Sequence, residues 1–237
     1  MNITISNIKK YFGQQCACNV PSLTINEGEL IGIVGNNGAG KTTLFRLMLD
    51  LIKADEGEIT MRGVPVSQSE EWKTFTGAYI DENFLINYLT PEEYFQFIAR
   101  IDNISSEMLE ERLYTFDHFM NGEIIGNNKL IRDLSAGNKQ KVGIIGAMLN
   151  QPKILILDEP FNFLDPSGQN IIKHLLTDYN KEHKAIILIS SHNLQHTIDI
   201  SNRILLLEKG ELIRDTLNDH GEGVNDIKDY FTKEANL

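Results

Sequence analysis

The eight residues from Gly35 to Thr42, GNNGAGKT, constrain the fold of this chain more than any other stretch. They match the pattern G-x-x-x-x-G-K-[ST] at every fixed position, and an apolar run over 30–34 comes directly before them. An apolar segment with a helical pattern, 43–52, follows. A buried strand, a glycine loop and a helix in this order are typical of a phosphate-binding loop. Glycines let backbone N–H groups approach an anion, and the start of the helix adds the positive end of its dipole.

We predict that the residues of this loop bind a nucleoside triphosphate. Lys41 supplies a point charge for the β- and γ-phosphates, and the Thr42 hydroxyl is a ligand for Mg²⁺. The residues expected to line the nucleotide are Gly35, Asn36, Asn37, Gly38, Ala39, Gly40, Lys41, Thr42 and Thr43. The alternative is a glycine turn with a chance lysine, which leaves the matching strand and helix on its two sides unexplained.

The length and charge of the chain limit the classes of protein to which it can belong. Its 237 residues are enough for one large domain or for a domain with a subdomain, and 41% hydrophobic residues allow a substantial core. The formal net charge of −11 argues against a general nucleic-acid binder, because a phosphate backbone would be repelled. It leaves room for a local basic groove.

The sequence shows no sign of a secreted or membrane-spanning protein. Its N-terminus has no basic segment leading into an apolar one, and no apolar run approaches the roughly 20 residues that cross a bilayer. Cys16 and Cys18 are one residue apart, which suits neither a zinc site nor a thioredoxin-like pair. We therefore expect reduced thiols in a cytosolic protein, with any membrane-spanning part supplied by a partner.

The hydrophobic pattern predicts an α/β fold. Residues 1–29 alternate between apolar and polar positions, which indicates short antiparallel strands with one wet face. The all-apolar runs 154–157 and 185–189 are typical of buried parallel strands, and 204–207 is a further strand. The segment that begins at Glu211 is expected to be a last strand at the edge of the sheet.

Capping residues predict where the helices begin. Thr90-Pro91-Glu92-Glu93 combines an N-cap threonine, a proline at the first helical position and a capping box. Further helices are expected over 105–119, over 135–149 and from Asp165 onward. The helical pattern from 83 to 133 predicts a helical insert between the first and second groups of strands.

Two carboxylates, Asp158 and Glu159, follow the apolar run 154–157. If this strand lies beside the strand that leads into the phosphate loop, Asp158 comes close to the metal of a bound Mg·nucleotide. Glu159, one residue further along, could then polarise a water molecule for attack on the γ-phosphate. The alternative is a chance Asp-Glu pair in a turn.

A second anion-binding segment, Leu134-Ser135-Ala136-Gly137-Asn138, precedes this strand. A serine and a glycine open a helix here, so a hydroxyl, exposed N–H groups and the helix dipole come together. Taken alone, this pattern fits an ordinary helix N-cap better than an anion site. Its order relative to the other motifs favours the functional interpretation.

In this order the motifs resemble those of the ATP-binding subunit of an ATP-binding-cassette (ABC) transporter, over almost the whole chain from Ile3 to about Ile213. The matching segments are Tyr11 (adenine stacking), 35–42 (Walker A), 134–138 (family signature), 154–159 (Walker B with its catalytic glutamate), Leu164-Asp165 (D-loop) and Ser191-His192 (switch histidine). The implied fold is a P-loop NTPase (RecA-like) α/β core with an antiparallel β subdomain and a helical subdomain. Core and β subdomain would occupy 1–82 and 152–215, the helical subdomain 83–151, and a C-terminal tail 216–237.

The resemblance also implies a mechanism with ATP and Mg²⁺ as cofactors. Two such domains pair head to tail, with ATP held between Lys41 and Thr42 of one copy and Ser135 and Gly137 of the other. Glu159 acts as general base, and His192 holds the γ-phosphate and the attacking water in line. The metal ligands that it implies are Thr42, Asp158 and Asp81.

The sequence departs from the family pattern at several positions. Ala136 and Asn138 stand where the signature usually has glycine and glutamine, and Phe163 stands where a glycine is common before the D-loop. Asp81 occupies the place of the usual Q-loop glutamine. A carboxylate can ligate Mg²⁺, but it adds negative charge beside the phosphates and cannot donate a hydrogen bond. Two alternatives follow. Either Asp81 contacts the metal, or Asp81 points to solvent and this loop contacts the nucleotide site through Glu82 or through its backbone alone.

The implied setting is a cytoplasmic protein, peripheral on the inner face of the cell membrane, that pairs with a second ATPase subunit and a separate permease and binds no nucleic acid. A homodimer is expected, and export is favoured over import because the short chain is closer to simple exporters than to sugar importers. The rival interpretations are a soluble ABC-type ATPase acting on nucleic acid or ribosomes, and another P-loop enzyme such as a small-molecule kinase.

The segment 83–97 is more apolar than a lone domain needs, so part of it should form an exposed groove for a permease helix. The alternative is that all of these residues fill the core. The residues concerned are Phe84, Leu85, Ile86, Tyr88, Tyr94 and Phe97.

Overall fold

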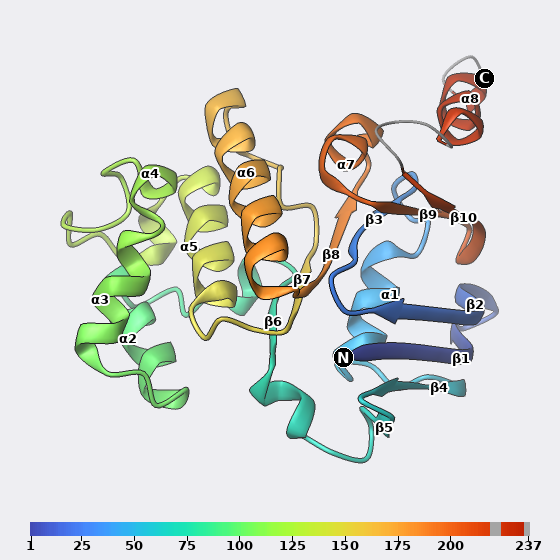
Figure 1. Ribbon diagram of the computed structural model, residues 1–237, viewed down its shortest axis with the longest axis horizontal. Helices are drawn as coiled ribbons and strands as arrows, with labels where there is room; N and C mark the ends of the chain where they lie inside the picture. Colours follow the sequence, from blue (N-terminus) through green and yellow to red (C-terminus); the bar gives the residue numbers. More distant parts are fainter. Residues whose placement is uncertain (219–223, 235–237) are drawn as a thin grey trace.

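A ten-stranded sheet runs through the described residues, 1–218 and 224–234, of the computed structural model (Figure 1). The strand order is β5-β4-β1-β2-β10-β9-β3-β8-β7-β6. The strands are β1 (Asn2–Phe12), β2 (Gln15–Asn26), β3 (Leu30–Val34), β4 (Glu56–Met61), β5 (Val64–Pro65), β6 (Thr76–Tyr79), β7 (Ile154–Leu157), β8 (Ile186–Ser191), β9 (Arg203–Glu208) and β10 (Glu211–Leu217). The α-helices are α1 (Lys41–Met48), α2 (Pro91–Ile101), α3 (Ser106–Tyr114), α4 (Asp117–Met120), α5 (Ala136–Met148), α6 (Pro166–His183), α7 (Leu194–Ile200) and α8 (Asn225–Glu234).

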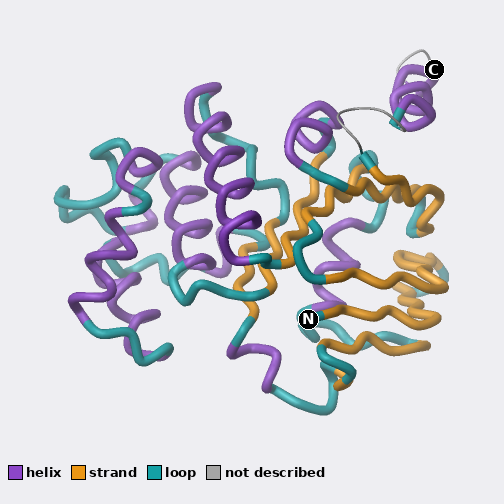
Figure 2. Tube along the Cα trace, viewed as in Figure 1, coloured by secondary structure: helices purple, strands orange, loops and turns teal. Residues whose placement is uncertain are grey.

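The strands β9, β3, β8, β7 and β6 run parallel, with helices against both faces (Figure 2). In β7, Ile154 and Ile156 belong to the apolar cluster of α1 on one face. The alternate residues Leu155 and Leu157 belong to the cluster of α5 and α6 on the other face. Burial on both faces is the reason why this strand has an uninterrupted apolar sequence.

β7 does not lie directly beside β3, as the sequence-based argument supposed, because β8 pairs with both strands. Val34 at the end of β3 pairs with Ser191, and Leu157 at the end of β7 pairs with Ile189. The carboxyl ends of the three strands still meet at one edge of the sheet, which is where open α/β sheets bind ligands.

β10 is an interior strand, so the prediction of an edge strand was wrong. It pairs antiparallel with β9 and makes a parallel contact with β2 through Glu211 and Asn19. The Asn19 N–H donates to the Gly210 carbonyl oxygen at 2.6 Å. All seven β10 residues are half-exposed or exposed, which gave the segment the polar pattern of an edge. The strand joins the antiparallel half of the sheet to the parallel half.

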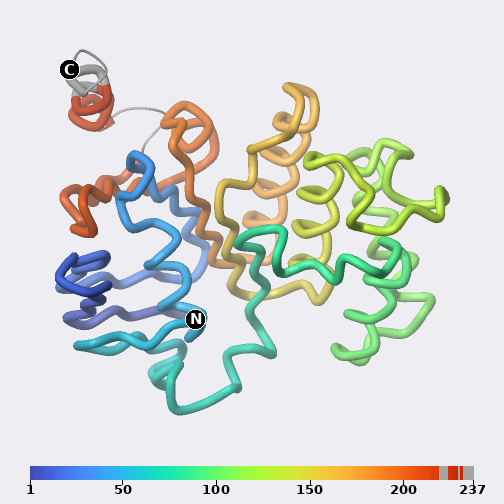
Figure 3. The backbone as a smooth tube through the Cα atoms, turned by 180° about the vertical axis from the view of Figure 1, so that it is seen from behind, coloured from blue at the N-terminus to red at the C-terminus, as the bar shows by residue number. Residues whose placement is uncertain are grey.

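Helices α2 to α5 gather at one end of the molecule, opposite the antiparallel strands (Figures 1 and 3). The predicted capping box at the start of α2 is confirmed: Thr90 Oγ1 accepts from the Glu93 N–H, and Glu93 Oε2 accepts from the Thr90 N–H. The helix expected over 105–119 is instead divided into α3 and α4. Phe116, with φ −99° and ψ 5°, has left the helical conformation between them.

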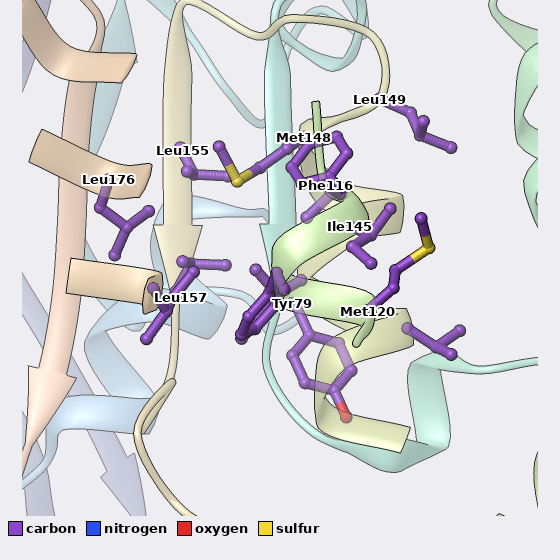
Figure 4. Packing of buried hydrophobic residues seen from close by; sticks show 14 of the residues in the cluster. Tyr79, Phe116, Met120, Ile145, Met148, Leu149, Leu155, Leu157 and Leu176 are labelled. Atoms are coloured by element: carbon purple, nitrogen blue, oxygen red, sulfur yellow. The ribbon is translucent and has the colours of Figure 1, made fainter. Parts of the chain in front are cut away.

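An apolar core joins these helices to the sheet (Figure 4). Phe116, Ile145 and Met148 from the helical side meet Leu155 and Tyr79 of the strands. The helix α5 comes very close to β6. A Cβ added at Gly143 would overlap the Tyr79 ring, so only glycine permits this approach. The helix that begins within the segment 134–138 is therefore held tightly against β6, the edge strand of the parallel half.

The C-terminal helix α8 packs beside the parallel strands. Val224 and Ile227 are buried in a cluster with Val34, Ile204 and Leu206. Of the predicted tail 216–237, positions 219–223 and 235–237 lie outside the described residues. Within the part that the structure describes, no helix is both long enough and apolar enough to cross a membrane.

Gly143→Ala is expected to lower the free energy of unfolding by about 2 kcal/mol, because overpacking a closed core has costs of this size. Gly146→Ala on the same helix is the matched control. Its added Cβ would lie 2.9 Å from Tyr94 Cε1 and 3.0 Å from Ile98 Cδ1, the mobile end of its side chain. Urea denaturation should show a larger loss of unfolding free energy for Gly143→Ala than for Gly146→Ala. Equal losses would contradict the tight contact between α5 and β6.

Candidate nucleotide-binding and catalytic site

The loop 35–42 leads from β3 into α1 at the carboxyl edge of the sheet. Gly40 is the N-cap of α1 and has a φ of +103°, which residues with a side chain rarely adopt. A Cβ at Gly40 would also lie 2.6 Å from the carbonyl oxygen of Ala17 in β2. Only glycine satisfies both conditions. The loop therefore brings its backbone to the start of α1, where N–H groups and the helix dipole favour an anion.

Lys41 is the first residue of α1 and is only 6% exposed. Its ammonium donates to the Gly35 carbonyl oxygen at 2.7 Å and to the Asn36 carbonyl oxygen at 3.3 Å, so it lies across its own loop. Its Nζ is also 3.6 Å from Glu159 Oε1. A buried charge needs such partners, and a phosphate would be a stronger one.

Asp158, directly after β7, is buried against two hydroxyl groups. Thr42 Oγ1 donates to Asp158 Oδ2 at 2.5 Å, and the Ser190 hydroxyl donates to Asp158 Oδ1. Burial raises the pKa of the Asp158 carboxyl, and the hydrogen bonds from Ser190 and Thr42 act in the opposite direction. Asp158 follows β7, Ser190 lies in β8 and Thr42 lies in α1.

Thr42 and Asp158 present the oxygen ligands that Mg²⁺ prefers. Among residues 1–218 and 224–234, no three His, Cys, Asp or Glu side chains converge on a possible metal position. A complete protein cage is not required, because Mg²⁺ in nucleotide sites keeps several waters and takes other ligands from the phosphates. The hydroxyl–carboxylate pair therefore fits a metal that arrives with a nucleotide.

Glu159 lies between Lys41 and His192. His192 Nδ1 is 2.9 Å from Glu159 Oε2, and the His192 backbone N–H donates to the same oxygen at 3.3 Å. The Glu159 backbone has a left-handed φ of +49°. The structure thus places the two residues predicted as catalytic in contact with each other and close to the loop lysine.

Two residues that hold the backbone of Glu159 were not predicted from the sequence. Ser190 Oγ accepts from the Glu159 N–H at 2.8 Å, and Gln140 Nε2 of α5 donates to the Glu159 carbonyl oxygen at 3.2 Å. Ser190 had a visible signal, since it is a hydroxyl residue near the end of an otherwise apolar strand. Gln140 had none, because its role depends on how α5 packs against the sheet.

Ser135 and Gly137 lie at the start of α5, apart from the loop 35–42. Ser135 Oγ accepts from the Asn138 N–H at 3.2 Å, as the predicted N-cap. A Cβ at Gly137 would lie 2.6 Å from the Phe163 carbonyl oxygen, so this position excludes a side chain. Both residues line a cavity of about 330 Å³ to which the loop 35–42 contributes no lining residue. Within one chain the two predicted anion-binding segments therefore do not line this cavity together.

Tyr11 lies near the end of β1, on the hairpin that borders the loop. It is 38% exposed and pairs with Cys16 next to a bulge. Ala17 follows Cys16, and its carbonyl oxygen is the atom that approaches Gly40 in the loop 35–42. Tyr11 thus offers a partly exposed aromatic side chain close to the loop.

Asp81, after β6, has protein partners at both carboxylate oxygens. Its Oδ1 accepts from the Asn83 N–H at 2.8 Å and so caps a short 3₁₀ helix, Glu82–Phe84. Its Oδ2 lies 3.4 Å from Arg46 Nη2 in α1. The sequence had suggested either a metal contact or a side chain in solvent, and the contact with Arg46 was not foreseen.

Three of the six apolar residues considered for a partner surface are exposed. Phe84, Tyr88 and Phe97 are 39%, 74% and 44% exposed. Leu85 and Tyr94 are buried in the core that the helices share with the sheet. The segment 83–97 is therefore not wholly used in packing the helical part of the molecule.

The fold and this site together define a P-loop nucleotide-binding protein of the α/β class. The profile of the ABC transporter family matches residues 18–162. The chain is 34% identical over 209 residues to the uncharacterized ABC transporter ATP-binding protein YhaQ of Bacillus subtilis (strain 168), covering 88% of this chain and 69% of that protein. The chain belongs to the ABC transporter family, as one of its ATP-binding proteins, which are ATPases.

Relatives with named cargo are similarly distant. The bacitracin transport ATP-binding protein BcrA of Enterococcus faecalis is 31% identical over 219 residues, covering 90% of this chain and 68% of that protein. The probable sulfate/thiosulfate import ATP-binding protein CysA of Chlorella vulgaris is 30% identical over 224 residues, covering 93% and 94%.

Solved structures confirm the predicted fold class. The dimeric structure of MJ0796, a bacterial ABC transporter cassette, has a TM-score of 0.81 at 26% identity, covering 92% of this chain and 99% of that chain. A structure of the ATP-binding subunit of an ABC transporter has a TM-score of 0.86 at 23% identity, covering 98% and 100%, and shows likeness of fold.

Phe163→Gly is expected to raise the free energy of unfolding by about 1 kcal/mol. Phe163 has a φ of +63° and is 72% exposed, so its ring gains little from packing. A side chain held in this region costs about 1–3 kcal/mol, against about 0.5–1 kcal/mol for the extra entropy of glycine. Phe97→Gly, at an exposed position inside α2, is the control and should be destabilising. A loss of stability in Phe163→Gly by denaturant titration would contradict the strained backbone.

Proposed function

We propose that this chain hydrolyses ATP for a transporter whose membrane-spanning part is a separate permease. The observation that supports hydrolysis is the position of Glu159, 3.6 Å from Lys41 and 2.9 Å from His192 at the carboxyl edge of the sheet. Thr42, next to Lys41 in the sequence, donates a hydrogen bond to Asp158, next to Glu159. A carboxylate beside a phosphate-binding lysine and a histidine is arranged to activate water next to a terminal phosphate.

In the proposed complex, ATP lies on the loop with its contacts at positions 35–43, and Tyr11 stacks on the adenine. Lys41 exchanges Glu159 for the β- and γ-phosphates, which are stronger acceptors. Thr42 and Asp158 would hold Mg²⁺, which when bound neutralises charge on the phosphates.

This exchange leaves Glu159 free to act as the general base. It accepts a proton from the attacking water, while His192 keeps the water and the γ-phosphate in line. The water oxygen forms a bond to the γ-phosphorus as the bond from that phosphorus to the β–γ bridging oxygen breaks. ADP and inorganic phosphate are the products, and Glu159 then releases its proton to solvent. The hydrogen bonds from Gln140 and to Ser190 keep the Glu159 backbone in place during this step.

We also propose that a second copy of the chain completes each site. Ser135 and Gly137 offer a hydroxyl and a backbone without a side chain at the start of α5, and both line a cavity that the loop 35–42 does not line. In a head-to-tail pair they would contact the γ-phosphate on the partner's loop. The similar cassette MJ0796 has been solved as a dimer. A homodimer is the simplest solution, because one chain carries both halves.

The proposed permease contact lies on the proposed helical subdomain, 83–151, at the exposed residues Phe84, Tyr88 and Phe97. Exposed aromatic residues close together in sequence suit a partner helix better than water. Such a contact would hold the protein at the inner face of the cell membrane. Export is the proposed direction of transport, and ATP-dependent accumulation of cargo inside inverted membrane vesicles would support it.

Glu159→Gln is expected to keep ATP binding and to lose turnover by at least about 100-fold, the scale of general-base catalysis. The amide has almost the same shape but cannot accept the proton. Because the pair cannot reopen by hydrolysis, this variant should elute as a dimer in size-exclusion chromatography with Mg·ATP and as a monomer without it. A monomer at saturating Mg·ATP would contradict the proposed pair.

Lys41→Ala is the companion variant, because it removes the phosphate contact and leaves the base. Loss of one charge-assisted contact should weaken ATP binding by about 10- to 100-fold. Lys181→Ala, at an exposed lysine of α6, controls for the loss of one positive charge. ATP affinity equal to that of the unchanged protein in Lys41→Ala would refute the assignment of the loop.

A further inference from the structure

Two neighbouring acidic residues, Asp81 and Glu82, connect the helices that begin at the two proposed phosphate-binding segments. Asp81 Oδ2 lies 3.4 Å from Arg46 Nη2 in α1, and Glu82 Oε2 lies 3.1 Å from Lys139 Nζ in α5. α1 begins at the loop 35–42, and α5 begins at the signature segment. The corner after β6 is thus joined by ion pairs to both helices.

The Asp81–Arg46 pair lies next to the Thr42–Asp158 pair. Arg46 follows Thr42 by four positions, which is one turn along the same face of α1. On the strand side, the Asp158 N–H donates to the Tyr79 carbonyl oxygen at 2.9 Å, and Asp81 comes two residues after Tyr79. Both pairs therefore connect α1 with the carboxyl ends of the neighbouring strands β6 and β7.

We propose that Arg46 and Mg²⁺ compete for the Asp81 carboxylate when a nucleotide is bound. The proposal rests on the proposed function, because it needs a triphosphate on the loop 35–42. A carboxylate near a triphosphate repels it unless a cation cancels the charge. Arg46 cancels that charge when the nucleotide arrives without metal, and gives way when the metal is present.

The contacts of Asp81 permit this exchange. The Asn83 N–H holds Oδ1 at 2.8 Å, so the carboxylate keeps its place when Oδ2 changes partner. The pair with Arg46 is long, and its side chains are 45% exposed for Arg46 and 34% exposed for Asp81. Such a pair changes a binding constant by about fivefold at most, so a divalent cation can displace it. Arg46 acts through Asp81 and is a positioning residue.

The Glu82–Lys139 pair supplies a matched control. It is a similar ion pair of 3.1 Å at the same corner, with the Glu82 side chain 61% exposed. Its lysine lies in α5 rather than in α1. Lys139→Met therefore removes the same positive charge from the same corner while leaving the contact between Asp81 and Arg46 in place.

The test is to measure ATP affinity by isothermal titration calorimetry over a range of free Mg²⁺, including none. Arg46→Met should weaken metal-free ATP binding by about fivefold and make the Mg²⁺ dependence steeper, because Asp81 loses its cation. Asp81→Asn should flatten the dependence, and the double variant should behave like Asp81→Asn. Arg46→Lys keeps the positive charge and should retain most of the Mg²⁺ dependence of the unchanged protein. Lys139→Met should leave that dependence unchanged.

Parallel Mg²⁺ curves for the unchanged protein and Arg46→Met would overturn the proposal. An Arg46→Met effect of the same size in the Asp81→Asn background would also overturn it, because Arg46 would then act directly on the phosphates. These results are distinct from failure of the proposed function, in which the unchanged protein would bind no ATP at any Mg²⁺ concentration. Thermal unfolding of each variant without nucleotide separates a folding defect from a change in metal dependence.

Discussion

The buried carboxylate of Asp158 is the constraint on which the arrangement of the site depends. A charged group that is only 7% exposed needs hydrogen-bond donors, and it takes them from Thr42 in α1 and Ser190 in β8. Because Asp158 directly follows β7, these bonds bring three distant segments of the chain to one edge of the sheet. Glu159 follows Asp158, His192 follows Ser190 by two residues, and the phosphate loop ends at Thr42, so the other functional groups arrive with them.

The helix α5 couples this edge to the helical end of the molecule. Gln140 donates to the Glu159 carbonyl oxygen, Gly143 packs against the Tyr79 ring, and Lys139 pairs with the corner after β6. These contacts lie within about one turn of α5, directly after the segment that holds Ser135. A change in the position of that segment would therefore reach Glu159, the proposed general base, through a short, well-packed helix. In the proposed head-to-tail pair, this would let one copy sense the nucleotide of the other.

Features with local causes could be predicted from the sequence, and features that depend on distant partners could not. The capping box at Thr90 and the apolar strand 154–157 are set by their own residues, and both were located correctly. The interior position of β10 depends on a hydrogen bond between Asn19 and Gly210, which no local pattern reveals. In the site, contiguous motifs identified the loop and the two carboxylates after β7. Gln140 and Arg46 escaped notice because each acts through a partner on another element.

The most direct test concerns the claim that loop 35–42 of one copy and the signature segment of another form a single ATP site. Two single-cysteine forms of Glu159→Gln, with Cys16 and Cys18 replaced, would carry either Asn37→Cys or Ala136→Cys and a different tag. A short bifunctional thiol reagent is then added to the mixture with or without Mg·ATP. Head-to-tail pairing predicts a cross-linked dimer of the two different forms, and only with Mg·ATP. Cross-links mainly between two Asn37→Cys chains, or none between the different forms at saturating Mg·ATP, would contradict it.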